Sequence, residues 1–522
     1  LAVILIAAGT GCRKSQFNIN QNPNDPTDSS VTFDVVLPAA LHASGAIVAG
    51  NGIGSWGTIQ CWMGYWSRSG TYAPNVIEET YQITTGFGNA IWNACYDNNY
   101  DYNIVQQKAA VAGAGFYEGV ARIMKAQNFQ ILVDVYGDVP YTQALKGSAN
   151  PTPSYDDDLA IYKDLLRQID TGIALIKAAV VTTTGPNRDI AKNDILFSAD
   201  KTKWAKLGNT LKLRMLVHAY AHAGIDKAAE IAKIDLEGNG YLAADATIQP
   251  TYAADKPMPF YGNYKVNAAG GTPQNQVYYA ANKWGLDYYT WNGDARRNVV
   301  YDQGTSGFVG VPYGLPPNDA NARAKVAGVG VGLYKTNASP QLFFSLAEAF
   351  LLRAEARARG FITNGPTTAV LLRDGIIASF TYLGVPSPTA AVDAYILGNA
   401  GYPDVDITAS AANTGYDAGP GGLGTILTQK WYAMNGVNSL EAWTDYRRVP
   451  MASLYPGRNA THFEVGLIGG YTSGPLLSVS PQLPPGSQIP VRFLYPQTEY
   501  NYNPANVPAG ITPLSKVFWD LN

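Results

Sequence analysis

The chain has 522 residues, a formal net charge of −3 and only 15% charged residues, while 46% of its residues are hydrophobic. This composition is typical of a folded protein and argues against disorder. A near-neutral charge without a basic block argues against nucleic acid as a partner. The sequence contains no run of eighteen apolar residues, so no membrane span is predicted. The length is compatible with about three domains, or with one large domain if helical repeats share a core.

Residues 1–12 read LAVILIAAGTGC. An apolar run followed by small residues and a cysteine is typical of an export signal that ends at a lipidation site, here Cys12. An ordinary signal core with an incidental cysteine is the alternative. Residues 13–31 are rich in Asn, Asp, Pro and Ser and offer little to bury. We therefore expect them to form a tether or a coil pinned to the surface.

Apolar residues then recur at helical spacing over much of the chain. Residues 116–136 are expected to form a helix buried on several faces that ends at Gly137. The turn that follows, over residues 134–141, is interpreted as structural. Further helices are expected at residues 32–50, 87–111, 156–179, 202–223, 226–237, 341–360, 366–380, 425–435 and 438–448.

Between and after these helices the sequence has a different character. Residues 238–340 accumulate Gly, Pro, Asn and Tyr, which predicts loops, with one helical piece at 276–289 and a short strand at 328–332. Residues 384–424 are expected to form a long loop. Residues 449–522 are expected to be irregular, with an apolar end at 517–520 that docks back on the core.

The order of helices separated by short turns predicts a mostly α fold, a stack of antiparallel helix pairs like that of tetratricopeptide repeats, with long irregular loops and minor short strands. No strict 34-residue repeat is present in the sequence. The helix-pair arrangement is thus inferred from the order of the helices.

Signals for catalysis or metal binding are weak. His218 and His222 stand four residues apart, but no third ligand accompanies them, and polar histidines on a helix face are the favoured interpretation. The acidic residues near Asp97 lack the pattern of a calcium loop. A pair of glycosidase carboxylates has no recognisable spacing in sequence. For Cys61 and Cys95, a disulfide and two buried free thiols are equally open.

Aromatic and polar residues gather in two clusters of the sequence. This mixture suits a sugar ligand, because the apolar C–H faces of a sugar stack on aromatic rings and its hydroxyls form hydrogen bonds with polar side chains. The first cluster is Trp62, Trp66, Arg68, Tyr72 and Asn75, and the second is Tyr261, Tyr264, Trp284, Tyr288, Trp291 and Asn292. Polar neighbours make Trp66 and Trp291 the favoured stacking rings, although core packing is the alternative for any single ring. We assign to the core Trp204, Trp431, Trp443 and Trp519.

Several short stretches together carry a family resemblance. They are 22–26 (Asn-Pro-Asn-Asp-Pro), 134–141, Trp204 with 211–214, 294–297, 348–356, 429–431, 441–448, 490–499 and 516–520. Taken together, these stretches make the chain resemble the SusD/RagB family, and in particular its SusD-like starch-binding outer-membrane lipoproteins. They occur in the same order as in that family and extend over nearly the whole chain. Ala295 departs from the family pattern, in which Pro is common at that position.

The resemblance implies a non-catalytic protein without a cofactor or metal, anchored by its lipid to the outer membrane of a Gram-negative bacterium and facing the cell surface. It would form a lid over a SusC-type TonB-dependent transporter and capture oligosaccharide or polysaccharide. Residues 32–522 would form one SusD-like domain, with a helical scaffold over 32–237 and 341–448. Its loop-rich ligand face would comprise 238–340 and 384–424.

Two other functions remain open at this point. A helical-repeat protein that binds a peptide or a protein partner is the second hypothesis, and a glycan-cleaving enzyme is the third. Arg13 and Lys14 follow Cys12 where the family has an acidic surface-export signal, so the leaflet of the anchor also remains open.

Overall fold

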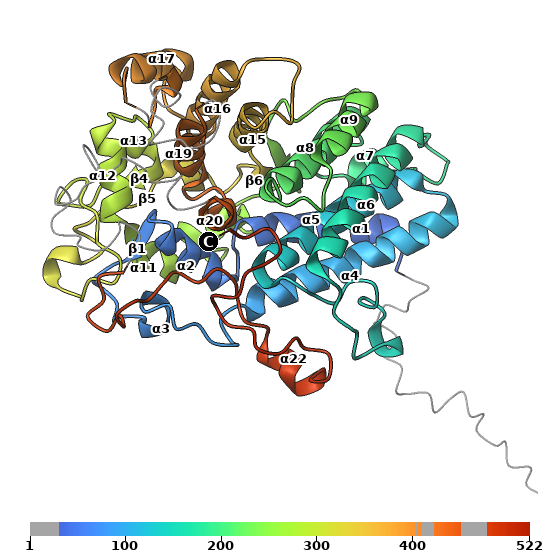
Figure 1. Cartoon of the computed structure of the whole chain (residues 1–522), viewed down its shortest axis with the longest axis horizontal. Helices are drawn as coiled ribbons and strands as arrows, with labels where there is room; N and C mark the ends of the chain where they lie inside the picture. Colours follow the sequence, from blue (N-terminus) through green and yellow to red (C-terminus); the bar gives the residue numbers. More distant parts are fainter. Residues whose placement is uncertain (1–30, 403, 409–421, 450–477, 522) are drawn as a thin grey trace, which may run out of the picture.

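The computed structural model describes residues 31–402, 404–408, 422–449 and 478–521. Helices dominate this part of the chain, and the strands are short and pair into three two-stranded sheets (Figure 1). The mostly α fold predicted from the sequence is thereby confirmed. None of the helices in the described ranges combines the length and the apolar character that a membrane crossing requires.

The helices fall into two long runs separated by shorter elements. The first run contains α1 (Phe33–Val48), α2 (Gly54–Trp62), α3 (Val76–Glu79), α4 (Asn89–Ala112), α5 (Gly115–Tyr136), α6 (Asp158–Ala178), α7 (Ile190–Asn193), α8 (Lys201–His218) and α9 (Lys227–Glu237). The second contains α15 (Leu346–Ala358), α16 (Thr368–Leu383), α17 (Pro388–Gly398), α19 (Leu423–Met434) and α20 (Ser439–Arg448). Between and after them lie α10 (Pro259–Tyr264), α11 (Gln274–Tyr278), α12 (Lys283–Trp291), α13 (Arg297–Val300), α14 (Val331–Tyr334) and α22 (Gln497–Tyr502).

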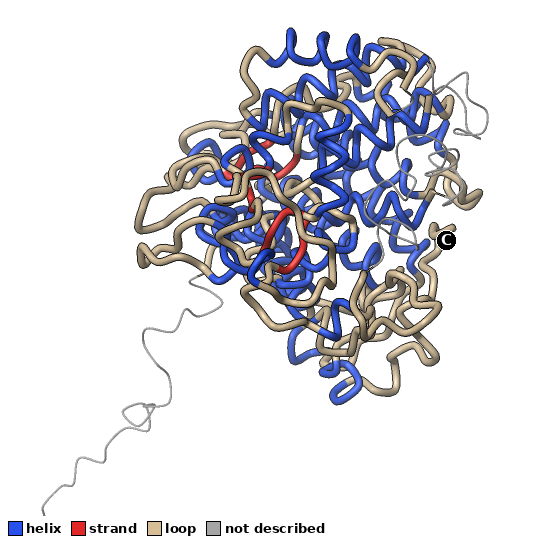
Figure 2. Tube along the Cα trace, turned by 90° about the vertical axis from the view of Figure 1, so that its left-hand side faces the viewer, coloured by secondary structure: helices blue, strands red, loops and turns tan. Residues whose placement is uncertain are grey.

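Each short sheet pairs two segments that are distant in the sequence. The strands are β1 (Trp66–Arg68) with β3 (Tyr279–Ala281), β2 (Ala246–Ile248) with β6 (Gln341–Phe344), and β4 (Tyr301–Asp302) with β5 (Gly328–Val329), all antiparallel. Figure 2 shows these strands enclosed by helices and loops, without an extended sheet. Their role is therefore to fix loops against the helical part of the molecule.

Aspartates begin several of the helices. Asp157, Asp200 and Asp226 each accept a hydrogen bond from a backbone N–H three residues later, at the starts of α6, α8 and α9. This side-chain contact satisfies an amide that has no partner within the helix, and a negative charge is favourable at that end. At the other end of α5, Gly137 has φ 75°, a conformation that favours glycine.

Helices α1, α4, α5 and α6 stack side by side as antiparallel neighbours (Figure 1). The hydroxyl of Ser44 on α1 lies 2.8 Å from that of Tyr102 on α4. Tyr96 of α4 packs edge-on against Phe129 of α5, with ring centroids 6.0 Å apart. Because α5 has neighbours on several sides, nearly all of its side chains are buried, as the apolar pattern of residues 116–136 predicts.

The C-terminal segment closes back on this stack. The indole Nε1 of Trp519 donates to Asp134 Oδ1 at 3.0 Å, and the Phe493 N–H donates to the Val135 carbonyl at 2.9 Å. Arg447 also donates to the Asp134 carbonyl at 2.6 Å. The turn after α5 is thus an anchoring point for distant segments, which confirms its structural interpretation and the docking of residues 517–520.

The structure corrects four expected boundaries. The helix expected at 276–289 is broken into α11 and α12, because β3 pairs with β1 between them. The helix expected at 202–223 ends at His218. The loop expected at 384–424 contains α17, which Pro388 begins. Of the strand expected at 328–332, only β5 forms, and the next residues build α14.

Candidate functional site

Most aromatic residues of the first predicted cluster are buried. Trp62 is fully buried, stacks on Phe87 with ring centroids 5.6 Å apart, and donates from Nε1 to the Glu78 carbonyl at 3.2 Å. Trp66 on β1 is 1% exposed and meets the edge of Tyr264 at 5.1 Å. The polar neighbours of Trp66 therefore do not mark a ring at the surface, which corrects that expectation.

The polar members of the first cluster hold the surrounding loops. Arg68 Nε donates to Glu79 Oε1 at 2.5 Å, and its other nitrogens donate to the carbonyls of Tyr72 and Leu315. Both charged side chains of this pair are buried, so the loss of either one would leave an uncompensated charge in the interior. Asn75 is half-buried and caps α3, and the half-buried Tyr72 ring packs on Tyr278 at 5.2 Å.

The second cluster is also buried for the most part. Tyr264, Trp284 and Tyr288 are at most 4% exposed, and Trp284 meets the edge of the half-buried Trp431 at 5.1 Å. The side-chain amide of Asn292 donates to the Tyr432 hydroxyl at 2.7 Å. Tyr261 is half-buried against Tyr334, with ring centroids 6.3 Å apart.

Strands β1 and β3 bring the two clusters together. Trp66 pairs in register with Ala281, and the contacts of Trp66 with Tyr264 and of Tyr72 with Tyr278 cross from one sequence region to the other. The clusters thus converge in space, but chiefly as packed rings. Of the residues assigned to the core from sequence, Trp204, Trp443 and Trp519 are at most 2% exposed, and Trp431 is half-buried.

Trp291, at the end of α12, is the predicted ring that reaches the surface. It is 38% exposed. The hydroxyl of its chain neighbour Thr290 accepts from Arg297 at 3.3 Å, and Asn298 accepts from the same guanidinium at 3.2 Å. An exposed indole beside a hydroxyl, a guanidinium and an amide has the chemistry that binds a sugar ring. We refer to Thr290, Trp291, Arg297 and Asn298 as the Trp291 surface.

A second exposed ring lies close to the Trp291 surface. Asn399 donates to the Asn292 carbonyl at 2.9 Å, and the Tyr402 N–H donates to the Asn399 carbonyl at 3.0 Å. Tyr402 is 44% exposed. Sequence reasoning missed Tyr402, although a tyrosine among the glycines and polar residues of the expected ligand loop 384–424 is a signal that could have found it.

Charged groups concentrate in the interior between α5, α8, α19 and α20. Glu441 accepts from His218 Nε2 at 3.0 Å and from Lys430 at 3.2 Å, and lies 3.3 Å from Arg214. Burial alone raises the pKa of the Glu441 carboxyl, but these three cations outweigh it and hold that pKa well below its usual range. Burial lowers the pKa of His218, but the carboxylates of Glu441 and Asp134 raise it by more, so the net shift of this pKa is upward.

This network is structural. Arg448 forms a two-pronged contact with the Glu355 carboxylate, with both distances 2.6 Å. The expectation that acidic and basic side chains of residues 441–448 pair at helix contacts is confirmed. His218 is fully buried within the network rather than on a polar face, and His222 lies beyond the end of α8, accepting from the Gly224 N–H. The two histidines therefore do not share one helix face.

Two further candidates from the sequence have structural explanations. Cys61 and Cys95 are both free and buried, which answers the open question about a disulfide, and burial raises the pKa of each thiol. The residues from Asp97 to Asn103 lie inside α4, so the region near Asp97 forms helix and not a loop.

Comparisons with known proteins place the chain in a family. A family model described as starch-binding and associating with the outer membrane matches residues 55–466. A search of curated proteins gives no match.

Several solved structures are similar in fold. A SusD homolog from Bacteroides fragilis superposes with a TM-score of 0.67 at 19% identity, over 91% of this chain and 94% of the other. A chitin-binding protein has a TM-score of 0.68 at 21% identity, over 93% and 100%. A chitin-binding SusD homolog from Flavobacterium johnsoniae has a TM-score of 0.67 at 19% identity, over 93% and 99%.

The matched family is described by binding and not by catalysis, which agrees with the non-catalytic role expected from the sequence. The family model covers more than half of the chain, and the fold matches extend over nine tenths of it. On these grounds the chain belongs to the SusD-like family of outer-membrane-associated nutrient-binding proteins.

Proposed function

We propose that this protein captures an oligosaccharide or polysaccharide at the outer membrane and delivers it to a SusC-type TonB-dependent transporter. Membership of a family described as starch-binding supports glycan as the ligand class. The transporter partner comes from the family resemblance of the sequence. We further propose that residues 32–522 form one domain, a proposal supported by the main apolar core, which contains both Leu37 and Trp519.

The observation that carries the proposal at the level of residues is the exposure of Trp291. Of the tryptophans predicted to bind ligand, Trp62, Trp66 and Trp284 are at most 2% exposed, whereas Trp291 is 38% exposed. A ring must present an open face to stack on a sugar, so we centre the proposed site on the Trp291 surface with Tyr402 as a neighbour. Tyr72, Asn75 and Tyr261 are half-buried and remain secondary candidates.

The other predicted binding residues take a different part in this proposal. Trp62, Trp66, Arg68, Tyr264, Trp284, Tyr288 and Asn292 are buried. Their rings and polar groups are packed against other parts of the chain: Trp62 stacks on Phe87, Arg68 pairs with Glu79, and Trp284 packs on Trp431. We propose that they support the loops of the ligand face and do not touch the ligand.

The anchor is a separate part of the proposal. Cys12 and the tether at 13–31 lie outside the described residues, apart from Val31, whose carbonyl accepts from Lys108 at 2.7 Å. The family's association with the outer membrane supports an anchor there. We propose that Cys12 carries the lipid and that the protein faces the cell surface.

The test of function is a binding panel of polysaccharides that includes starch and, because two similar structures are chitin-binding proteins, chitin oligosaccharides. The proposal predicts retention of the protein on at least one glycan without the release of new reducing ends. New reducing ends would instead indicate an enzyme. Binding to no glycan, together with capture of a peptide, would favour the peptide-binding alternative.

A further inference from the structure

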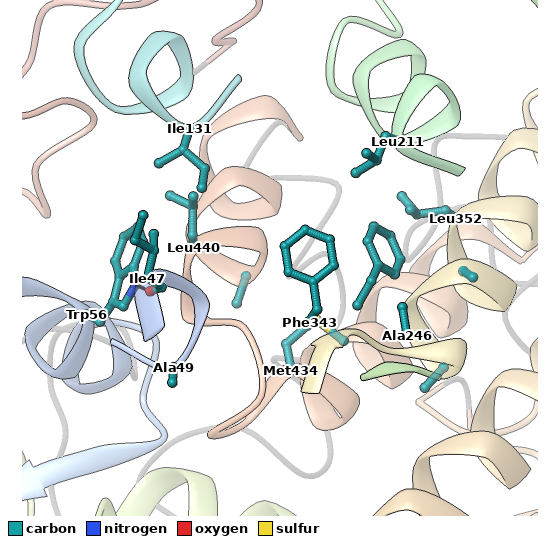
Figure 3. Close-up of a cluster of buried hydrophobic side chains, with 14 of the residues drawn as sticks. Ile47, Ala49, Trp56, Ile131, Leu211, Ala246, Phe343, Leu352, Met434 and Leu440 are labelled. Atoms are coloured by element: carbon teal, nitrogen blue, oxygen red, sulfur yellow. Dashed lines mark hydrogen bonds between the residues drawn. The ribbon is translucent and has the colours of Figure 1, made fainter. Parts of the chain in front are cut away.

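A small cavity lies between strand β1, which pairs with β3 of the expected ligand face, and the charged interior. It has a volume of about 40 Å³. One part of its wall is apolar: Figure 3 shows Trp56, Ile131, Phe343 and Leu440 from this wall. The remaining wall is polar and contains charged side chains of the interior network. The cavity therefore joins two regions of the molecule that have different chemistry.

Two polar atoms at this cavity have no protein partner among the described residues. They are the indole Nε1 of Trp66, a donor, and the side-chain Oε1 of Gln130, an acceptor. Both residues line the cavity and are at most 2% exposed. A buried donor or acceptor without a partner is costly, and buried polar groups in native proteins are nearly always satisfied by protein or by ordered water.

The neighbouring wall is built to bind polar molecules. Glu441 and Arg214 both line the cavity, and Arg214 Nε lies 3.3 Å from Glu441 Oε1. Gln127, on the same wall, accepts from Arg214 at 3.3 Å. Carboxylate and amide oxygens retain capacity for further hydrogen bonds after such contacts. The site thus offers several charged or polar partners around the two unsatisfied atoms.

The size of the cavity selects the occupant. One water molecule needs roughly 10–15 Å³ of such space, so about 40 Å³ holds about three waters. We propose that the cavity is a binding site for two or three ordered water molecules, which accept from Trp66 Nε1, donate to Gln130 Oε1 and hydrate the Arg214–Glu441 pair.

In this role the waters connect the loops of the ligand face to the scaffold. Trp66 belongs to β1, which pairs with β3, while Gln130 belongs to α5 and its side-chain nitrogen lies 3.4 Å from His218 Nδ1. A water bridge between them is enthalpically close to a direct hydrogen bond. The inference concerns the interior and is independent of whether the Trp291 surface binds a glycan.

The test is a crystal structure of the full chain at a resolution that shows ordered water. We expect two or three density peaks in the cavity, one within hydrogen-bond distance of Trp66 Nε1 and one within that distance of Gln130 Oε1. An empty cavity, or a direct protein partner for either atom, would overturn the proposal. Density for a molecule larger than water would also overturn it.

A pair of matched variants sharpens this test. Trp66→Phe removes the unpartnered donor of a ring that lines the cavity, whereas Trp62→Phe removes an indole whose Nε1 already donates to the Glu78 carbonyl. The water beside position 66 should be lost or displaced in the first variant and retained in the second. In solution, the indole N–H of Trp66 in the unmutated protein should show magnetisation transfer from long-lived water. Its absence would contradict the crystallographic assignment.

Discussion

Gly119 of α5 and Gly172 of α6 face each other so closely that neither position has room for a side chain. A Cβ atom added to Gly172 would lie 2.7 Å from the Gly119 carbonyl oxygen, and one added to Gly119 would lie 2.5 Å from the Gly172 carbonyl oxygen. The two central helices of the stack therefore approach through backbone. This contact sets the distance between α5 and α6.

Gly172→Ala should consequently separate α5 from α6. We expect the free energy of unfolding to fall by about 1–3 kcal/mol, the usual cost of overpacking a close contact. Gly54→Ala is the matched control, because a Cβ at Gly54 meets nothing within 4 Å. Chemical denaturation of both variants measures the effect. Equal stability of the two variants would show that the helices can move apart without cost.

Trp443→Ala tests the packing of α20. The ring is fully buried, its Nε1 donates to the Pro490 carbonyl at 2.8 Å, and the Arg447 guanidinium lies 3.7 Å above it. Truncation leaves a cavity and an unpaired carbonyl, so a loss of about 3–5 kcal/mol in unfolding free energy is expected. A thermal midpoint that stays within error of the unmutated protein would refute this placement.

Much of this architecture was readable from local pattern. The helix at 116–136 has an apolar surface on most sides and a glycine stop, and both signals are local in sequence. The break of 276–289 was not readable, because it depends on the pairing of Trp66 with Ala281, more than two hundred residues away. Long-range pairing of this kind leaves no periodic signal in either segment.

The candidate site was less predictable than the fold. Polar neighbours in the sequence predict exposure at both Trp66 and Trp291, but the structure buries the first ring and exposes the second. The difference arises from tertiary contacts: Tyr264 covers Trp66, whereas Trp291 ends its helix at the surface. Neighbours in sequence do not report which ring a distant loop will cover.

Asp158 gives a prediction about pH. Burial raises its pKa, hydrogen bonding from the Phe518 N–H partly offsets this, and the carboxylates of Asp138 and Asp157 raise it again, to about 6. An unfolded aspartate has a pKa of about 3.9. Between about pH 4 and pH 6 the folded protein therefore binds more protons at this position than the unfolded chain, so raising the pH lowers stability there.

Asp158→Asn should remove this dependence while the amide oxygen still accepts from the backbone. We expect the variant to gain stability relative to the unmutated protein as the pH rises from about 4 to about 7. Urea denaturation at several pH values gives the two curves. Parallel curves over this window would mean that Asp158 titrates in the folded state as it does in the unfolded chain.

Cys12→Ser tests the proposed anchor. The variant should fold normally, because residue 12 is 21 positions before the start of α1 at Phe33, and it should leave the membrane fraction. Loss of the buried acyl chains removes about 0.8 kcal/mol of membrane affinity for each CH₂ group. The measurement is the amount of protein retained in carbonate-washed membranes of cells that express each form. Full retention of the variant would count against lipidation at this cysteine.

Glycan capture at the Trp291 surface is tested most directly by calorimetry of Trp291→Ala with the glycan that the panel retains best. Loss of one stacking ring from a preformed site should weaken binding by about tenfold to a hundredfold. Because Trp291 is 38% exposed, the thermal midpoint should remain unchanged, whereas Trp66→Ala, which truncates a buried ring, should lower it. Unchanged glycan affinity in Trp291→Ala would contradict the account.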